Sequence, residues 1–133
     1  MSESTNIELL HRAWEAMSGA GDLSILEGAL DPQAKWRGVE DGASICENRK
    51  MILTVMRRNL HGGLVGRIEE TVEVGGRIVV AFRPDQPRED RRPLDQGIAY
   101  VVVTMRDGLV IELKGCTNRA AAVAYAQTAT LQS

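Results

Sequence analysis

The segment 67–82 constrains the fold more than any other part of the chain. Over 67–74, apolar residues such as Ile68 and Val72 recur on one side of a two-residue period, and polar residues dominate the other side. That period is typical of a β-strand with one covered face. Two glycines follow at 75–76, and a glycine pair between two such runs is a strong signal for a tight hairpin turn. The segment therefore predicts an antiparallel hairpin.

A second hairpin is predicted nearer the C-terminus. Residues 97–105 read GIAYVVVTM and residues 109–115 read LVIELKG, with Arg-Asp-Gly between them as the turn. The two hairpins are joined by 83–96, which holds three of the four prolines and many charged residues. Such a segment indicates a long exposed loop, either a lid or a solvated hairpin tip.

Helical spacing of apolar residues occurs three times before the first hairpin and once after the last strand. The predicted helices cover about 7–17, 22–30 after an N-cap at Asp22, 48–60 after an N-cap at Asn48, and 119–128 after a cap at Thr117 or Asn118, with a short strand at 34–40. Helices segregated from an antiparallel sheet make an α+β domain. Long strands twist and curl, so we expect a curved antiparallel sheet wrapped around the N-terminal helices, a cone-shaped barrel with an internal pocket.

Length and charge exclude several classes of protein. The chain has 133 residues and a formal net charge of −2, which fits a single domain over 1–133 and lacks the basic stripe that nucleic-acid binding requires. Cys46 and Cys116 have no CxxC spacing, so no metal site is expected; a disulfide between them stays open. No apolar run approaches the length of a membrane span, and the N-terminus does not read as a signal peptide. We expect a cytoplasmic protein that neither crosses nor binds a membrane.

Three strings carry a resemblance to a known family. They are RAWEAMSGAGDLSIL at 12–26, KWRG at 35–38 and DGLVIELKGCTNRAAAV at 107–123. Their order and spacing resemble the SnoaL-like branch of the nuclear transport factor 2-like superfamily over about 8–126. The resemblance implies a cone-shaped α+β fold with a deep pocket, often dimeric through the outer face of its sheet. Because this fold hosts several enzyme types and non-enzymatic binding domains, it does not give the function.

The family's best-known acid and base positions are vacant or altered in this chain. Similarity to ketosteroid isomerase puts Trp14, Gly38 and Val102 where that enzyme has its tyrosine, its base and its oxyanion-binding acid. Similarity to SnoaL-type cyclases puts Gly115 where many relatives carry an acid. The resemblance therefore argues against both of these reactions in their usual form.

The remaining polar side chains still allow general acid–base chemistry. Glu40 and Asp41 follow the first strand and could act as a base at the rim, His61 ends the third helix, and Tyr100 could donate a hydrogen bond. Each also has a structural interpretation: an exposed loop pair, a helix-end histidine, and a core tyrosine. The pocket lining is predicted to be apolar, with Trp14, Met17, Trp36, Met56 and Val102.

The alternation of residues along the last strands also predicts which face of the sheet is outside. The resemblance implies that Tyr100 and Val102 face the cone. Apolar Ile111 and Leu113 belong on the concave side of the last strand, so we expect Glu112 and Lys114 to point outward with Val101 and Val103 beside them. Such an outer face suits the contact of a homodimer.

Three functions stay open at this point. One is a domain that binds a small hydrophobic molecule in an apolar pocket, with no assigned chemistry. Another is an isomerase, cyclase or hydratase without metal or organic cofactor, acting on a polyketide- or steroid-like substrate by general acid–base catalysis. A third is a purely structural dimerisation domain.

Overall fold

The predicted hairpins form one six-stranded sheet in a computed structural model, which describes residues 2–38, 44–61, 66–84 and 98–132. The strand order is β2-β1-β6-β5-β4-β3. The strands are β1 (Leu30–Arg37), β2 (Ser44–Cys46), β3 (Gly66–Val74), β4 (Arg77–Pro84), β5 (Ala99–Arg106) and β6 (Leu109–Cys116). The two outermost strands do not pair with each other, so the described sheet is an open cone and not a closed barrel.

Both predicted hairpin turns are confirmed. Gly75 and Gly76 join β3 to β4 with φ of 53° and 87°, and Asp107 and Gly108 join β5 to β6 with φ of 54° and 79°. Two consecutive positive φ angles are those of the type I′ turn, whose twist matches that of the flanking strands. The residues at these positions therefore set the register of both hairpins.

Two expectations about the strands are wrong. The sheet is mixed, because β1 runs parallel to β6, whereas all strands were expected to be antiparallel. The first strand also begins earlier than expected, at Leu30, and so includes Pro32. Proline is tolerated there because β2 pairs with β1 only at Trp36 and Arg37, which leaves the start of β1 without a neighbour on that side among the described residues.

Bulges bend the sheet. The register shifts between Ile68 and Glu70 in β3, and Ile111 is an extra residue in β6, since Met105 pairs with Val110 and Thr104 pairs with Glu112. An extra residue bends the strand that carries it and increases the local twist.

Four helices accompany the sheet in the described ranges: α1 (Ser2–Ala20), α2 (Ser24–Ala29), α3 (Arg49–His61) and α4 (Arg119–Gln132). The predicted caps of the last two are confirmed: the side-chain oxygens of Asn48 and Asn118 accept hydrogen bonds from the amides of Met51 and Ala121, at 3.0 and 2.8 Å. The short α2 begins after Asp22, whose carboxylate accepts from the Ser24 amide at 2.9 Å.

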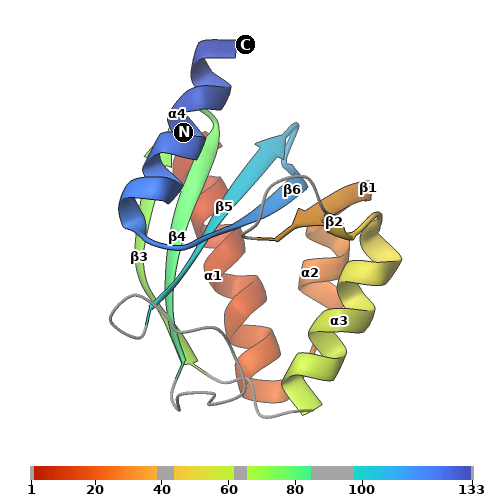
Figure 1. Ribbon diagram of the computed structural model, residues 1–133. Helices are drawn as coiled ribbons and strands as arrows, with labels where there is room; N and C mark the ends of the chain where they lie inside the picture. Colours follow the sequence, from red (N-terminus) through yellow and green to blue (C-terminus); the bar gives the residue numbers. More distant parts are fainter. Residues whose placement is uncertain (1, 39–43, 62–65, 85–97, 133) are drawn as a thin grey trace.

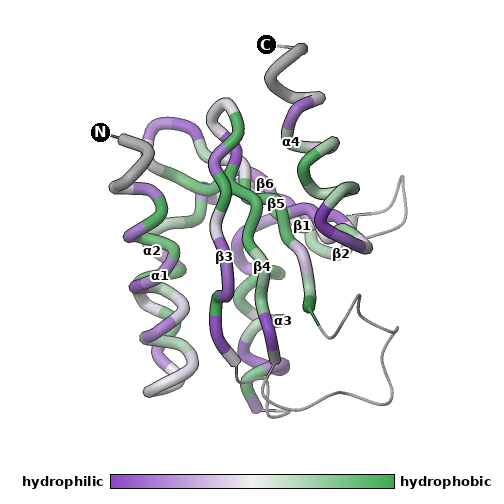
Figure 2. The backbone as a smooth tube through the Cα atoms, turned by 90° about the vertical axis from the view of Figure 1, so that its left-hand side faces the viewer, coloured by the Kyte–Doolittle hydropathy of each residue, from purple (hydrophilic) through white to green (hydrophobic). Residues whose placement is uncertain are grey.

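The elements form three layers (Figures 1 and 2). Helices α1, α2 and α3 pack on one face of the sheet, which we call the inner face, and α4 packs on the opposite face. The inner core includes Met17, Ile52 and Val103, and the smaller core under α4 includes Tyr100, Val102 and Ala126. No described helix is both long and apolar enough to cross a bilayer.

The expected assignment of faces on β5 is therefore wrong. Val101 and Val103 lie on the inner face with α1–α3, whereas Tyr100 and Val102 lie under α4. On β6 the expectation holds. Leu113 is on the inner face, and the carboxylate of Glu112 points to the other face, where it accepts a hydrogen bond from the hydroxyl of Tyr125 in α4. The physical reason is the bulge at Ile111, which shifts the partner of Val102 from Leu113 to Lys114.

Candidate functional site

The inner face of the sheet becomes less covered from one row of side chains to the next. Residues that pair across neighbouring strands form such rows. Met105 and Val110 make a buried row, with 9% and 1% of their surface exposed. In the next row Val103 is still buried at 3%, whereas its partner Leu113 is half-buried.

The third row is open along its whole described length. Val80 pairs with Val101, Val101 pairs with Gly115, and all three are half-buried although they lie on the central strands of the sheet. Beyond Val80, Phe82 is half-buried as well. Apolar side chains in the middle of a sheet are normally covered completely by the opposite layer. The inner face is thus buried at one end and partly exposed at the other.

Four of the five side chains predicted to line the pocket lie on the side of α1–α3. Met17 is buried in the inner core, and Trp14, Trp36 and Met56 are half-buried against it. The fifth, Val102, lies under α4 with none of its surface exposed. It faces away from α1–α3, for the register reason given above.

Trp14 is held in place beside the half-buried end of the inner face by two contacts. Its indole Nε1 donates a hydrogen bond to the Gly66 carbonyl at 3.0 Å, and its ring meets Phe82 edge-on, with centroids 4.5 Å apart and an interplanar angle of 76°. An edge-to-face pair of this kind is a favourable aromatic contact. The only polar group of the indole is used inside the fold, which leaves the ring as apolar surface.

The residues predicted to be catalytic are not brought together among the described parts. Glu40 and Asp41 lie outside the described residues. His61 is exposed at the end of α3. Tyr100 is buried, at 8% exposure, in the core under α4. The two described candidates therefore lie on different layers of the fold.

A polar cluster that was not predicted as a unit lies between the sheet and α4; we call it the α4 cluster. Its centre is Glu112, only 15% exposed, whose Oε1 accepts from the Tyr125 hydroxyl at 2.5 Å. Its Oε2 accepts from Arg37 Nε at 2.7 Å. Arg77 donates to the Tyr125 backbone carbonyl at 3.0 Å and lies 4.5 Å from the centroid of that ring. Lys114 donates to the Gly38 carbonyl at 2.6 Å.

Electrostatics indicate that this cluster holds the helix and does not transfer protons. Burial, with the hydrogen bond to Glu112 second, raises the pKa of Tyr125 to about 12, so its hydroxyl stays a donor at neutral pH. The hydrogen bond to Glu112 also raises the pKa of Arg37. Since both oxygens of Glu112 accept from fixed donors, the carboxylate is engaged as an anchor for α4. A second tie joins Arg119 of α4 to Glu70 through two 3.2 Å contacts.

Comparisons with known proteins identify the fold. The structure is similar to Bal32a from a soil-derived mobile gene cassette, with a TM-score of 0.65, 21% identity and coverage of 84% of this chain and 88% of that one. It is similar to a candidate SnoaL-like polyketide cyclase from Jannaschia sp. CCS1, with a TM-score of 0.63, 18% identity and coverage of 93% of this chain and 92% of that one. It is also similar to an NTF2-like protein of unknown function from Burkholderia pseudomallei, with a TM-score of 0.60, 18% identity and coverage of 90% of this chain and 95% of that one. The chain has the nuclear transport factor 2-like (NTF2-like) fold. No family model and no curated protein matches its sequence.

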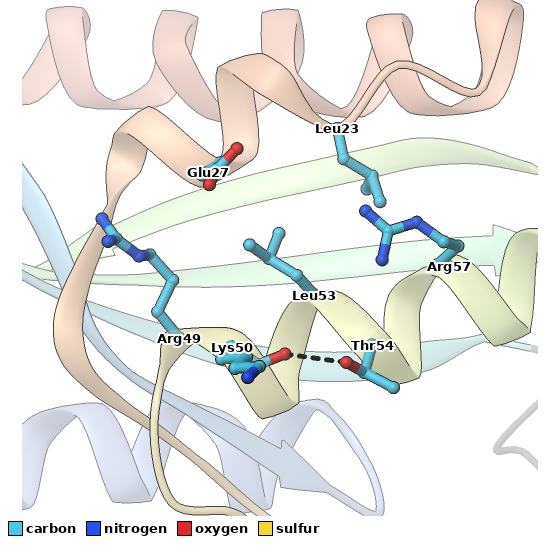
Figure 3. A pocket seen from close by; sticks show the side chains of 7 residues that line it. All are labelled: Leu23, Glu27, Arg49, Lys50, Leu53, Thr54 and Arg57. Atoms are coloured by element: carbon cyan, nitrogen blue, oxygen red, sulfur yellow. Dashed lines mark hydrogen bonds between the residues drawn. The ribbon is translucent and has the colours of Figure 1, made fainter.

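The NTF2-like domain also has a hollow on its surface, between α2 and α3, with a volume of about 310 Å³ (Figure 3). It is partly open to solvent. Its lining is contributed by the turn before α2, by α2 and by α3: Leu23, Glu27, Arg49, Lys50, Leu53, Thr54 and Arg57. Nothing in the sequence placed the cations of α3 opposite α2.

The cysteines of this NTF2-like domain are both free. Cys46 is fully buried in the inner core, and Cys116 is half-buried beside the core under α4. Burial raises the pKa of both thiols. A raised pKa keeps a thiol protonated and unreactive. Neither cysteine is therefore a good candidate for a nucleophile.

Proposed function

We propose that this NTF2-like domain is a cytoplasmic small-molecule-binding protein that takes an apolar ligand at the open end of its inner face. One observation carries the proposal: along the inner face the first row is buried, the second row is buried at Val103 and half-buried at Leu113, and the third row is half-buried at Val80 and Val101. Central-strand side chains that remain partly exposed leave apolar surface to be covered by a ligand.

The chemistry of the exposed rows favours a hydrophobic ligand. Most described side chains there are aliphatic or aromatic; Thr71, which pairs with Val80, is a polar exception, and the indole nitrogen of Trp14 is already bonded within the protein. Each methylene that a ligand buries against such a surface contributes about 0.8 kcal/mol. Affinity would therefore come from shape and apolar area, and the ligand would need few hydrogen-bonding groups.

An enzymatic function is the second candidate. In that case the domain would be a cofactor-independent isomerase, cyclase or hydratase on a hydrophobic polyketide- or steroid-like substrate. The supporting observation is that Trp36, at the end of β1, lies beside the half-buried Leu113 at the open end; Glu40 and Asp41 follow β1 in the sequence. A double variant, Glu40→Gln with Asp41→Asn, should keep ligand affinity in a binding protein and remove turnover in an enzyme.

A neutral fluorescent probe tests the binding proposal. N-phenyl-1-naphthylamine brightens on entering an apolar site and carries no charge. Val101→Phe places a ring in the third row, so it should weaken probe binding by tenfold or more. Val123→Phe adds the same ring to α4, on the other side of the sheet, and should leave binding unchanged. A folded Val101→Phe protein that binds the probe as well as the wild type would refute the proposal.

The proposed homodimer needs a revised contact. Val101 and Val103 lie on the inner face, and α4 covers part of the outer one. A dimer through the outer face would therefore be made by α4 and the strand surface that α4 leaves uncovered. Sedimentation velocity of the wild type and of Val123→Phe tests this: a dimer through α4 should dissociate in the variant, and a monomeric wild type would refute it.

A further inference from the structure

We propose that the hollow between α2 and α3 is a second binding site, for a small organic anion: a carboxylate or phosphate carried on a short apolar chain. The site is separate from the inner face and does not depend on the function proposed above. Three features of the hollow support this site: the charges that line it, their positions along α3, and the leucines beside them.

Three cations line the hollow, and none has an ion-pair partner within the ranges that the structure describes. They are Arg49, Lys50 and Arg57. Arg49, Leu53 and Arg57 follow at intervals of four residues, which places them on one face of the helix. Figure 3 shows Arg49 and Arg57 on either side of Leu53, with all three directed toward α2. The two guanidinium groups thus border the hollow from either end, although Arg57 also keeps much of its surface exposed to solvent.

The position of these cations is unfavourable for the helix itself. Arg49 and Lys50 occupy the first turn of α3, where the helix dipole is positive, and that turn holds no acidic residue. An arrangement made only for stability would place an acid there. The whole chain carries a formal charge of −2, so a local excess of cations stands out against its surroundings. The helix end and the cations together create a positive potential that an external anion would relieve.

The rest of the lining sets the kind of anion. Leu23 and Leu53 are almost buried, at 8% and 9% exposure, and the surface they retain borders the hollow. They provide an apolar contact beside the charges, as a short alkyl or acyl chain requires. Glu27 lies across the hollow and opposes a second anionic group. A volume of about 310 Å³ is at the lower end of small-molecule sites, which suits a ligand with one anionic head and a short tail.

Calorimetric titration with hexyl phosphate, with inorganic phosphate as reference, tests the site in the full-length protein. Hexyl phosphate should bind about tenfold more tightly than inorganic phosphate, since two buried methylene groups are worth about that factor. Arg57→Gln should weaken hexyl phosphate binding about tenfold through the loss of a charge-assisted contact. The matched control is Arg58→Gln, which removes the same charge from the next, exposed residue, outside the lining of the hollow; its affinity should stay within about twofold of the wild type.

Each of several outcomes would overturn the proposal. Equal weakening by Arg57→Gln and Arg58→Gln would show a diffuse charge effect without a site. Equal affinity for the two phosphates would remove the role of Leu23 and Leu53. The variant Val101→Phe separates this proposal from the one for the inner face. This variant should bind hexyl phosphate as the wild type does. If it loses that binding, hexyl phosphate binds on the inner face and not in the hollow.

Discussion

Replacing Tyr125 by phenylalanine should loosen α4 from the sheet. The change removes only the hydroxyl that donates to Glu112 at 2.5 Å, while Glu112 keeps Arg37 and the ring keeps its contact with Arg77. A hydrogen bond to a charged acceptor contributes about 1.5–3 kcal/mol to stability. Tyr125 is half-buried, so we expect the lower end of that range, a loss of about 1.5 kcal/mol in the free energy of unfolding.

Tyr100 offers a matched control for this change. It is the chain's other tyrosine, it lies under the same helix, and its hydroxyl has no hydrogen-bond partner among the described residues. Tyr100→Phe should therefore change the free energy of unfolding by no more than about 0.5 kcal/mol. Since Tyr100 faces away from α1–α3, the same variant should also leave binding of the neutral probe unchanged.

Urea and thermal denaturation followed by circular dichroism would measure both variants. For a chain of this size, 1.5 kcal/mol corresponds to a fall of about 5 °C in the midpoint temperature. If Tyr125→Phe proves as stable as Tyr100→Phe, the bond to Glu112 contributes nothing, and the anchoring role given to the α4 cluster is wrong. A change in the slope of the urea transition would indicate instead that the variant alters the unfolded ensemble.

Two further predictions concern the α4 cluster and the inner core. The folded protein holds the pKa of Tyr125 at about 12, above the usual value near 10, so folding favours the protonated phenol; its contribution is complete below pH 10 and is lost as the pH rises toward 12. The difference in urea midpoint between wild type and Tyr125→Phe should therefore shrink above pH 10, and a constant difference up to pH 12 would contradict this cause. Val103→Lys should unfold the protein, with a loss of at least about 4 kcal/mol, because the side chain is 3% exposed on the inner face; a folded variant by circular dichroism would show that Val103 is not in the core.

The local signals in the sequence predicted the elements well. Paired glycines and Asp107–Gly108 gave two hairpins because their backbone angles suit few other residues. Asn48 and Asn118 marked helix starts because their side chains replace the missing backbone acceptors. The fold class followed from the order of these elements, and the similarity to NTF2-like structures confirms it.

Relations between distant segments were harder to predict. The parallel pairing of β1 with β6 joins residues more than seventy positions apart, and no short pattern encodes it. The α4 cluster depends on the same pairing, since Arg37 reaches Glu112 only when β1 lies beside β6. The family resemblance put Tyr100 on the wrong face. The bulge that sets the true face is at Ile111, which looks like an ordinary strand residue in the sequence and is visible as a bulge only in the register.

That bulge has a consequence for how the shape of the inner face could change over evolution. Val110 and Leu113 both point inward only because Ile111 is inserted between Val110 and Glu112. Deleting Ile111 would restore a regular ladder, with Val110 opposite Met105 and Glu112 opposite Thr104 as now, so no other side chain would change face. The strand would lose its local bend. A single-codon deletion could therefore change the curvature of the inner face while preserving the identity of the side chains that cover it.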